Sequence, residues 1–304
     1  MTVDRPPVRP VAALRRFAIA ITVLNLLGHS WLGFEQSWLQ PVAALLTAYG
    51  LELALEAASA WAARRRPRFA DGVGAFIDSL LAAHITGLAV AMLLYANSRV
   101  WPVVFATAVA IGSKALLRVP TSGGRWRHVM NPSNFGISVT LVLLPWVSIA
   151  PPYQFTEALS GWGDWALPVV IVVSGSLLNA LFTRRITLIL AWLVGFAGQA
   201  VARHLLTGAS LPAALAPMTG VAFVLFTFYM ITDPATTPSS RRGQIAFGVG
   251  VAAAYGALVS QHVVFGMFFA LTGVCCARGA LLAIGARRRT PLAAAQEAPY
   301  AMPA

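Results

Sequence analysis

Four titratable side chains in two apolar stretches of the sequence could carry protons or cations. Glu52 and Glu56 are four residues apart, so on a helix they would lie on the same face. Asp78 and His84 follow in the next apolar stretch. Charged side chains are costly in an apolar helix, and where they occur they usually face the bundle interior and mark an ion pathway. The pattern predicts a proton or cation path made of these four residues.

A purely structural interpretation of the same residues is also open. The arginines of the segment Arg64–Arg68 lie within two or three helical turns of Glu56 and Asp78, and could form ion pairs with both. His84 could be a hydrogen-bonded interior residue. Glu52 lies deeper in its stretch, and both interpretations are open for it.

Two polar, proline-containing segments each interrupt the apolar pattern. They are Gly123–Gly136, with Asn131-Pro132, and Ile231–Gly243, with Asp233-Pro234. The residue before a proline is driven out of the helical conformation, and Asn or Asp at such a turn can cap free backbone N–H groups. Broken backbone at membrane depth is tolerated only where it lines a cavity or is buried in protein. One such segment would be an ordinary capped loop, whereas two favour a shared buried site.

The remaining reactive residue types predict no metal centre. His29, His204 and His262 lack the spacing of metal ligands. Cys275 and Cys276 are adjacent and are the two cysteines of the chain, which excludes a disulfide framework or a multi-cysteine cluster site.

The elements that must position these residues follow from the composition. The chain has 304 residues, of which 58% are hydrophobic and 11% are charged, with a mean hydropathy of +0.72. A soluble domain has about 25% charged residues. The composition therefore excludes a soluble enzyme, a nucleic-acid-binding protein and a disordered chain, and indicates an all-α integral membrane protein in a lipid bilayer.

At about 20 residues per crossing, the length allows about ten transmembrane helices. We expect a single transmembrane domain over 15–285, with disordered tails at 1–14 and 286–304. The apolar runs predict spans at Phe17–Phe34, Val42–Ala63, Ala75–Tyr95, Val100–Leu117, Asn134–Ile149, Trp165–Phe182, Ile186–Ala202, Leu211–Ile231, Ile245–Ser260 and Val263–Leu282.

The distribution of basic residues predicts the orientation. If the N-terminus is inside, twenty Lys and Arg residues lie on the inner side, and Arg99 and Arg203 lie outside. This asymmetry follows the positive-inside rule and predicts that both termini are cytoplasmic. The net charge of +12 is thereby explained by topology and contact with anionic lipids, with no nucleic-acid partner.

Several of these strings carry a family resemblance. Asn131–Gly136 before an apolar helix and Thr232-Asp233-Pro234 at the end of another resemble the NqrB/RnfD/RsxD family of membrane electron-transport subunits. Ala83–Gly87 and Phe228–Pro234 are most similar to its branch described as enediyne biosynthesis protein UnbU. The resemblance spans most of the chain. It implies two five-helix halves, inverted because five is odd, in a fold similar to urea and ammonium channels.

The resemblance also implies a flavin, FMN or riboflavin. Family members often carry FMN esterified to the threonine of an Asp-x-x-Ser-Gly-Ala-Thr motif on the outer side. The nearest match is 204–210, where His204 replaces the acid, Thr207 precedes the Gly-Ala pair, and Ser210 replaces the acceptor threonine. An ordinary glycine-containing loop is the alternative. With a flavin, Arg203 and His204 could neutralise its phosphate.

The functional expectations follow from these features. The leading one is flavin-linked electron transport in a bacterial plasma membrane, with partner subunits and a role in enediyne biosynthesis as the branch implies. For this function, the cytoplasmic approach to the flavin would be lined by Asn131, Asp233 and Thr236. The alternatives are a transporter that uses the acidic path, or an accessory protein with neither activity.

Overall fold

The computed structural model describes residues 10–120 and 126–296. These residues are mainly helical, and they also include four short strands. In chain order the elements are α1 (Pro10–Leu27), η1 (Gly28–Leu32), α2 (Leu39–Ala62), η2 (Arg68–Ala70), α3 (Val73–Leu93), β1 (Leu94–Tyr95), α4 (Trp101–Leu116), β2 (Arg118–Pro120), β3 (Trp126–His128), α5 (Pro132–Leu143), β4 (Ser148–Ile149), η3 (Pro152–Phe155), α6 (Gly163–Leu178), η4 (Asn179–Thr183), α7 (Ile186–Thr207), α8 (Leu211–Leu215), η5 (Ala216–Thr219), α9 (Val221–Leu225), η6 (Phe226–Met230), α10 (Arg241–Ser260) and α11 (Gly266–Gln296).

The lengths and composition of these helices indicate a multi-pass membrane protein. Within the described part of the chain, seven helices are long and apolar enough to cross a membrane, or eight if one bent pair forms a single span. The apolar helices α4 and α5 have 16 and 12 residues. At 1.5 Å per residue they reach about 24 Å and about 18 Å, less than the roughly 30 Å of a hydrocarbon core. The all-α membrane class is thus confirmed, while ten full crossings stay a prediction.

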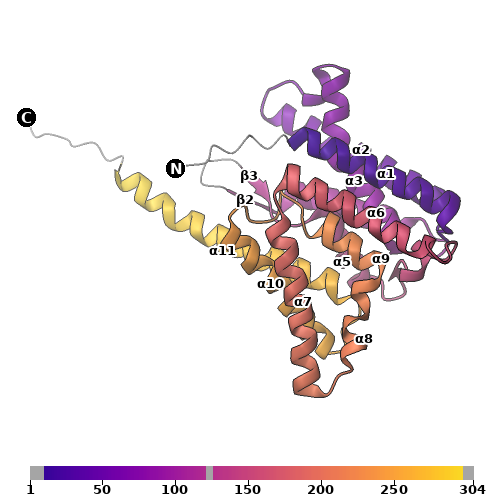
Figure 1. Cartoon of the computed structure of the whole chain (residues 1–304). Helices are drawn as coiled ribbons and strands as arrows, with labels where there is room; N and C mark the ends of the chain where they lie inside the picture. Colours follow the sequence, from indigo (N-terminus) through magenta and orange to yellow (C-terminus); the bar gives the residue numbers. More distant parts are fainter. Residues whose placement is uncertain (1–9, 121–125, 297–304) are drawn as a thin grey trace, which may run out of the picture.

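The span predicted at Leu211–Ile231 is wrong as one continuous helix. Its halves, Leu211–Thr219 and Val221–Met230, meet at 67°. Pro217 has no N–H to donate within the turn, and Gly220 between the halves is extended, with φ −85° and ψ 142°. The break brings η6 and the segment after it to the centre of the molecule (Figure 1).

Both predicted tails differ from the structure at their inner edges. The helix α1 begins at Pro10, within the predicted tail 1–14, and α11 continues to Gln296, within the predicted tail 286–304. Alanine and leucine are among the best helix formers, and both segments are rich in them. The rest of each tail lies outside the described residues.

Two short antiparallel ribbons, which the sequence analysis did not predict, join helix ends. One pairs β1 with β4, with Leu94 opposite Ile149. The other pairs β2 with β3, with Arg118 opposite His128, and Val129 N continues the pairing to Leu117 O at 3.0 Å. The second ribbon contacts α11 and leads directly into the Asn131 turn.

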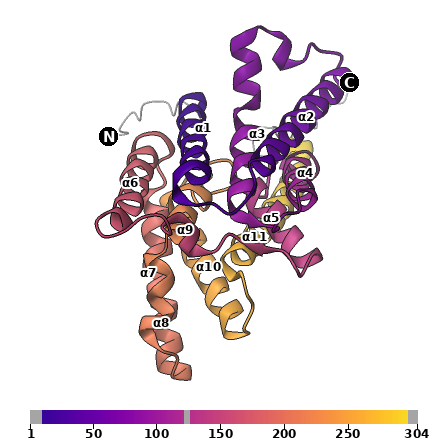
Figure 2. The same cartoon turned by 90° about the vertical axis from the view of Figure 1, so that its right-hand side faces the viewer.

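The helix contacts of the first half recur in the second half. In the first half α1 contacts α3, α2 contacts α4, and α4 contacts α5; in the second, α6 contacts α9, α7 contacts α10, and α10 contacts α11. Each half also begins with a helix that ends in a π-helical turn followed by a residue with positive φ, Gly33 or Arg184. In both views α1 lies beside α6 (Figures 1 and 2).

Candidate functional site

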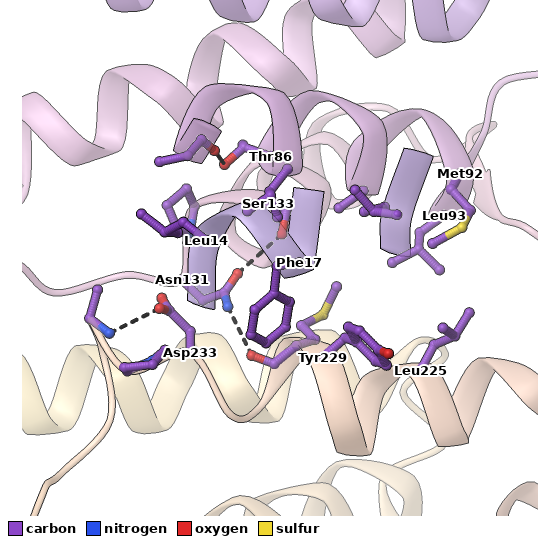
Figure 3. A pocket seen from close by; sticks show the side chains of 18 of the residues that line it. Leu14, Phe17, Thr86, Met92, Leu93, Asn131, Ser133, Leu225, Tyr229 and Asp233 are labelled. Carbon is purple, nitrogen blue, oxygen red and sulfur yellow. Dashed lines mark hydrogen bonds between the residues drawn. The ribbon is translucent and has the colours of Figure 1, made fainter. Parts of the chain in front are cut away.

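A cavity of about 340 Å³ lies between the two halves, where the two proline-containing segments meet (Figure 3). Its walls are mostly apolar and come from α1, α3 and η6. Phe17 and Tyr229 form one of these walls, with their rings edge to face and 5.4 Å between centroids. The polar side chains of the lining are Thr86, Lys114, His128, Asn131, Ser133, Tyr229 and Asp233.

Asn131 links the two segments at this cavity. It is the N-cap of α5, with Pro132 in the first turn, and its Oδ1 accepts hydrogen bonds from Asn134 N at 3.1 Å and Ser133 Oγ at 3.2 Å. Its Nδ2 donates to Met230 O, 2.9 Å away at the end of η6. One buried side chain therefore caps the first segment and holds the second against it.

Asp233 organises the second segment into a compact turn. Its Oδ1 accepts from Ala235 N at 2.9 Å, and its Oδ2 accepts from Thr236 Oγ1 at 3.0 Å. Its carbonyl oxygen accepts from Thr237 Oγ1 at 2.6 Å. The carboxylate stays at the cavity wall, and each oxygen keeps a lone pair that a ligand could use.

Three guanidinium groups surround this turn from outside the cavity. Arg127 and Arg185 both donate to the carbonyl oxygen of Pro234, and Arg278 donates to that of Thr236 at 2.8 Å. Arg185 is buried, and its Nε also donates to Thr237 Oγ1 at 2.8 Å. Burial lowers the pKa of Arg185 from its usual value, and the positive charge of Arg127 lowers it further.

His128 adds an imidazole to the cavity lining. Burial is the largest cause of its lowered pKa, and the nearby carboxylate of Asp233 partly opposes the shift. The positive charges of Lys114 and Arg127 add to the lowering. We therefore expect His128 to be uncharged at neutral pH.

The structure places the acidic residues of the predicted ion path in separate ion pairs. Glu56 is buried and binds Arg65 at 2.6 Å and Arg68 at 2.8 Å, as the structural interpretation expected. Asp78 pairs with Arg15 at 2.8 Å, and not with the Arg64–Arg68 segment, because α1 packs along α3.

Glu52 and His84 also have specific partners. Glu52 Oε2 lies 2.7 Å from the Nζ of Lys114, which lines the cavity. His84 lies between Thr22 Oγ1 at 2.7 Å and Tyr49 OH at 2.6 Å. Among the described residues, the cavity lining includes none of the four path residues themselves.

The predicted flavin-attachment segment lies at the far end of α7 from the cavity. The helix α7 begins directly after Arg185, is 22 residues or about 33 Å long, and contains His204 and Thr207 in its last turn. His204 Nδ1 donates to Ala209 O at 2.8 Å, and Thr207 Oγ1 donates to Arg203 O at 2.7 Å. Ser210 is the exposed N-cap of α8, and its hydroxyl makes no capping hydrogen bond. The predicted cofactor-binding residues thus form two separate groups.

Sequence reasoning missed several residues of the cavity and its surroundings. Phe17 lies in an apolar helix in which any face could have been buried, so no signal distinguished it. Arg278 carried a signal that was not used: a charge inside an apolar run usually faces protein. Lys114 carried another, as the single lysine beside twenty-one arginines.

Neither a search for metal-binding groups nor comparison with known proteins assigns a function to this cavity. Within the part of the chain that the structure describes, no group of three or more His, Cys, Asp or Glu side chains could hold a metal ion. A comparison with protein-family models found no match, and a comparison with curated proteins found none either.

Proposed function

We propose that this chain is a membrane subunit that holds a flavin in the central cavity and takes part in electron transport. The observation that carries the proposal is the cavity itself, where the Asn131 and Asp233 segments meet. We further propose ten crossings in two inverted five-helix halves, with both termini on the cytoplasmic side of a bacterial plasma membrane. The recurring helix contacts and the basic residues of the inner loops support this topology.

The size and the lining of the cavity suit an aromatic ring system. Small-molecule sites are typically concave, largely apolar and about 300–1,000 Å³, with a few polar groups that fix the orientation of the ligand. The rings of Phe17 and Tyr229 and the thioethers of Met92 and Met230 supply apolar and polarisable walls. The isoalloxazine ring of a flavin has two flat apolar faces, which such walls could contact, and one polar edge.

The polar groups at one end suit the polar edge of that ring. The carboxylate of Asp233 can accept a further hydrogen bond, as from a ring N–H, and the neutral imidazole of His128 can donate or accept. Bound there, a flavin would supply one- and two-electron transfer. The chain itself would orient the ring, exclude water with the apolar walls, and place a proton donor at its polar edge.

The electron-transport role needs partner subunits. The two cysteines of the chain cannot hold an iron–sulfur cluster, which takes four ligands. Any such cluster would belong to another subunit. A covalent flavin at Ser210 is a separate part of the proposal, supported by the exposed hydroxyl that makes no capping bond.

A transporter on the same fold is the alternative function. It is favoured by the broken span at Gly220, because discontinuous helices often form the substrate site of transporters. Against it, Glu52, Glu56 and Asp78 are held in ion pairs and do not line the cavity.

The first experiment is to purify the protein in an uncharged detergent after co-expression with a flavin transferase, and to measure bound flavin by absorbance. Acid denaturation then separates released flavin from flavin that stays on the denatured band. Ala89→Leu would place three further carbon atoms in the cavity and narrow it, and Ala246→Leu, on the exposed face of α10, is the matched control. We expect wild type and the control to release flavin and Ala89→Leu to release little.

The outcomes separate the parts of the proposal. In-gel fluorescence that disappears in Ser210→Ala would establish the covalent flavin. A wild-type band without fluorescence would refute the covalent flavin and leave the flavin in the cavity as a proposal. If wild type neither releases flavin after incubation with riboflavin and with FMN nor keeps flavin on the denatured band, the electron-transport proposal is wrong.

A further inference from the structure

Three arginines from distant parts of the chain converge on one short loop. Arg127 belongs to β3, Arg185 directly precedes α7, and Arg278 lies in α11. All three donate to backbone carbonyls within residues 234–236. The three arginines therefore reach the loop from three separate elements.

The acceptors of these three guanidinium groups are neutral. In the part of the chain that the structure describes, the four ion pairs use Arg15, Arg65, Arg68 and Lys114, and none uses an arginine of this cluster. The nearest carboxylate, Asp233, is bonded to Ala235 N and Thr236 Oγ1. The cluster therefore keeps an excess of positive charge.

This excess is partly buried, which makes it costly. Arg185 has only 6% of its surface exposed, and burial is the largest cause of its lowered pKa. The positive charges of Arg127 and Arg278 lower this pKa further, and the carboxylate of Asp233 partly opposes them. Buried like charges are tolerated when a counter-charge is bound, because burial raises the cost of each unpaired ion. A bound anion would offset this cost.

The cluster adjoins the central cavity through Pro234. Pro234 lines the cavity, and its carbonyl oxygen accepts hydrogen bonds from Arg127 and Arg185. Lys114 and His128 also line the cavity, and the charges of Lys114 and Asp233 both act on His128. A ligand with an apolar body could thus occupy the cavity and place an anionic group against the arginines.

We propose that Arg127, Arg185 and Arg278 form a binding site for the phosphate group of an amphipathic phosphate ester whose apolar part enters the cavity. Guanidinium groups bind phosphate in a fork geometry and stay charged at any physiological pH. Arg127 and Arg278 are partly exposed and would contact the phosphate, while Arg185 would add positive charge from behind. The ester could be a soluble molecule or a lipid headgroup.

This inference rests on the cavity being a ligand site, as proposed above, and not on the ligand being a flavin. The probes are therefore inorganic phosphate and phenyl phosphate, titrated by calorimetry into delipidated protein in an uncharged detergent. Arg278→Gln removes the charge and keeps a hydrogen-bond donor on the side chain. Arg242→Gln is the matched control, because Arg242 is exposed at the start of α10.

We expect phenyl phosphate to bind more tightly than inorganic phosphate, and benzyl alcohol not to bind. Removing one charged donor in Arg278→Gln should weaken the affinity for phosphate about ten-fold or more. The Arg242→Gln control should leave this affinity unchanged. Arg127→Gln should weaken binding similarly and serves as the second variant if Arg278→Gln misfolds. Absence of phosphate binding to wild type, or equal affinity in all variants, would overturn the site.

A lipid arm identifies the source of the phosphate. Reconstitution into phosphatidylcholine vesicles with and without phosphatidylglycerol is followed by the same phenyl phosphate titration. If phosphatidylglycerol weakens the binding of phenyl phosphate to wild type and has no such effect in Arg278→Gln, the natural ligand is a lipid headgroup. If phosphatidylglycerol leaves the binding of phenyl phosphate unchanged, the natural ligand is a soluble ester. A protein that binds phosphate but never flavin would refute the flavin proposal and keep this one.

Discussion

Lys114 Nζ lies 2.7 Å from Oε2 of Glu52, across the interface between α4 and α2. Both side chains are largely buried, with 14% and 21% of their surface exposed. The pair joins a residue predicted to carry ions to a residue that lines the cavity. Its effects on stability and on transport can be measured separately.

Glu52→Gln should destabilise the protein by about 1–3 kcal/mol, because it leaves the ammonium of Lys114 partly buried without a counter-charge. The double variant Glu52→Gln/Lys114→Met should be more stable than the single variants predict by addition. Thermal unfolding in detergent, followed by circular dichroism, provides both values. Strict additivity would show that the pair contributes nothing. Under the transport alternative, the same single variant should also abolish substrate flux in vesicles.

Gly136→Ala should disrupt the packing of α5 against α4. An added Cβ would overlap the carbonyl oxygen of Ala106 and would lie 2.9 Å from the Cβ of Ala110, and backbone cannot move aside as a flexible side chain can. We expect a loss of about 1–3 kcal/mol or failure to fold. Gly112→Ala, in α4 with open space around it, is the control and should gain up to about 1 kcal/mol. Equal unfolding temperatures for the two variants would contradict the close approach.

Tyr49→Phe and Thr22→Val should each remove one hydrogen bond to His84, at a cost of about 1 kcal/mol. Since the imidazole bonds to α1 on one side and α2 on the other, the two changes share a partner and should not be additive. Unfolding temperatures of the single and double variants test this. Should both single variants match wild type, His84 would have no part in joining these helices.

The lowered pKa of His128 predicts a loss of stability in mild acid. Above the ordinary histidine pKa of about 6.5, the imidazole is neutral in both the folded and the unfolded chain. As the pH falls below that value, the unfolded chain takes up a proton that the folded chain binds less well, so the free energy of unfolding decreases. The loss ends once the pH is below the folded pKa.

Unfolding temperatures of wild type and His128→Gln between pH 7 and pH 5 measure this effect. The variant should show a shallower decline than wild type, because it has lost one titrating group. A parallel decline of both proteins would show that His128 is not the cause.

The sequence predicted much of the fold because apolar length is a local property. Each of the ten predicted spans contains helix in the structure, and the Asn131 and Asp233 turns were placed from the prolines that follow them. The break at Gly220 was missed because Pro217 alone allows either a kink or a continuous helix. The exact partners of Asp78 and Glu52 were missed because they depend on which helices touch, which charge counting cannot determine.

The cavity illustrates the same limit. Asn131 and Asp233 were predicted because each directly precedes a proline, and a proline ends a helix through its effect on the residue before it. Phe17 and Arg278 were not, since their role arises from contacts with residues far away in the chain. The family resemblance, the flavin and the electron-transport role remain predictions that the experiments above address.

The π-helical turn η6 makes the cavity sensitive to chain length. Within it, Ile231 N donates to Phe226 O, five residues back, and the carbonyls of Met230 and Phe228 accept from the side chains of Asn131 and Asn179. A π-turn holds one more residue than an α-turn, so deletion of one residue from 226–230 would restore a regular helix. The residues after the deletion would keep their register, but the carbonyls that accept from Asn131 and Asn179 would return to the bonding pattern of a regular helix. The contact between the Asn131 segment and η6 would then be lost, so an in-frame deletion here should damage the site more than most substitutions.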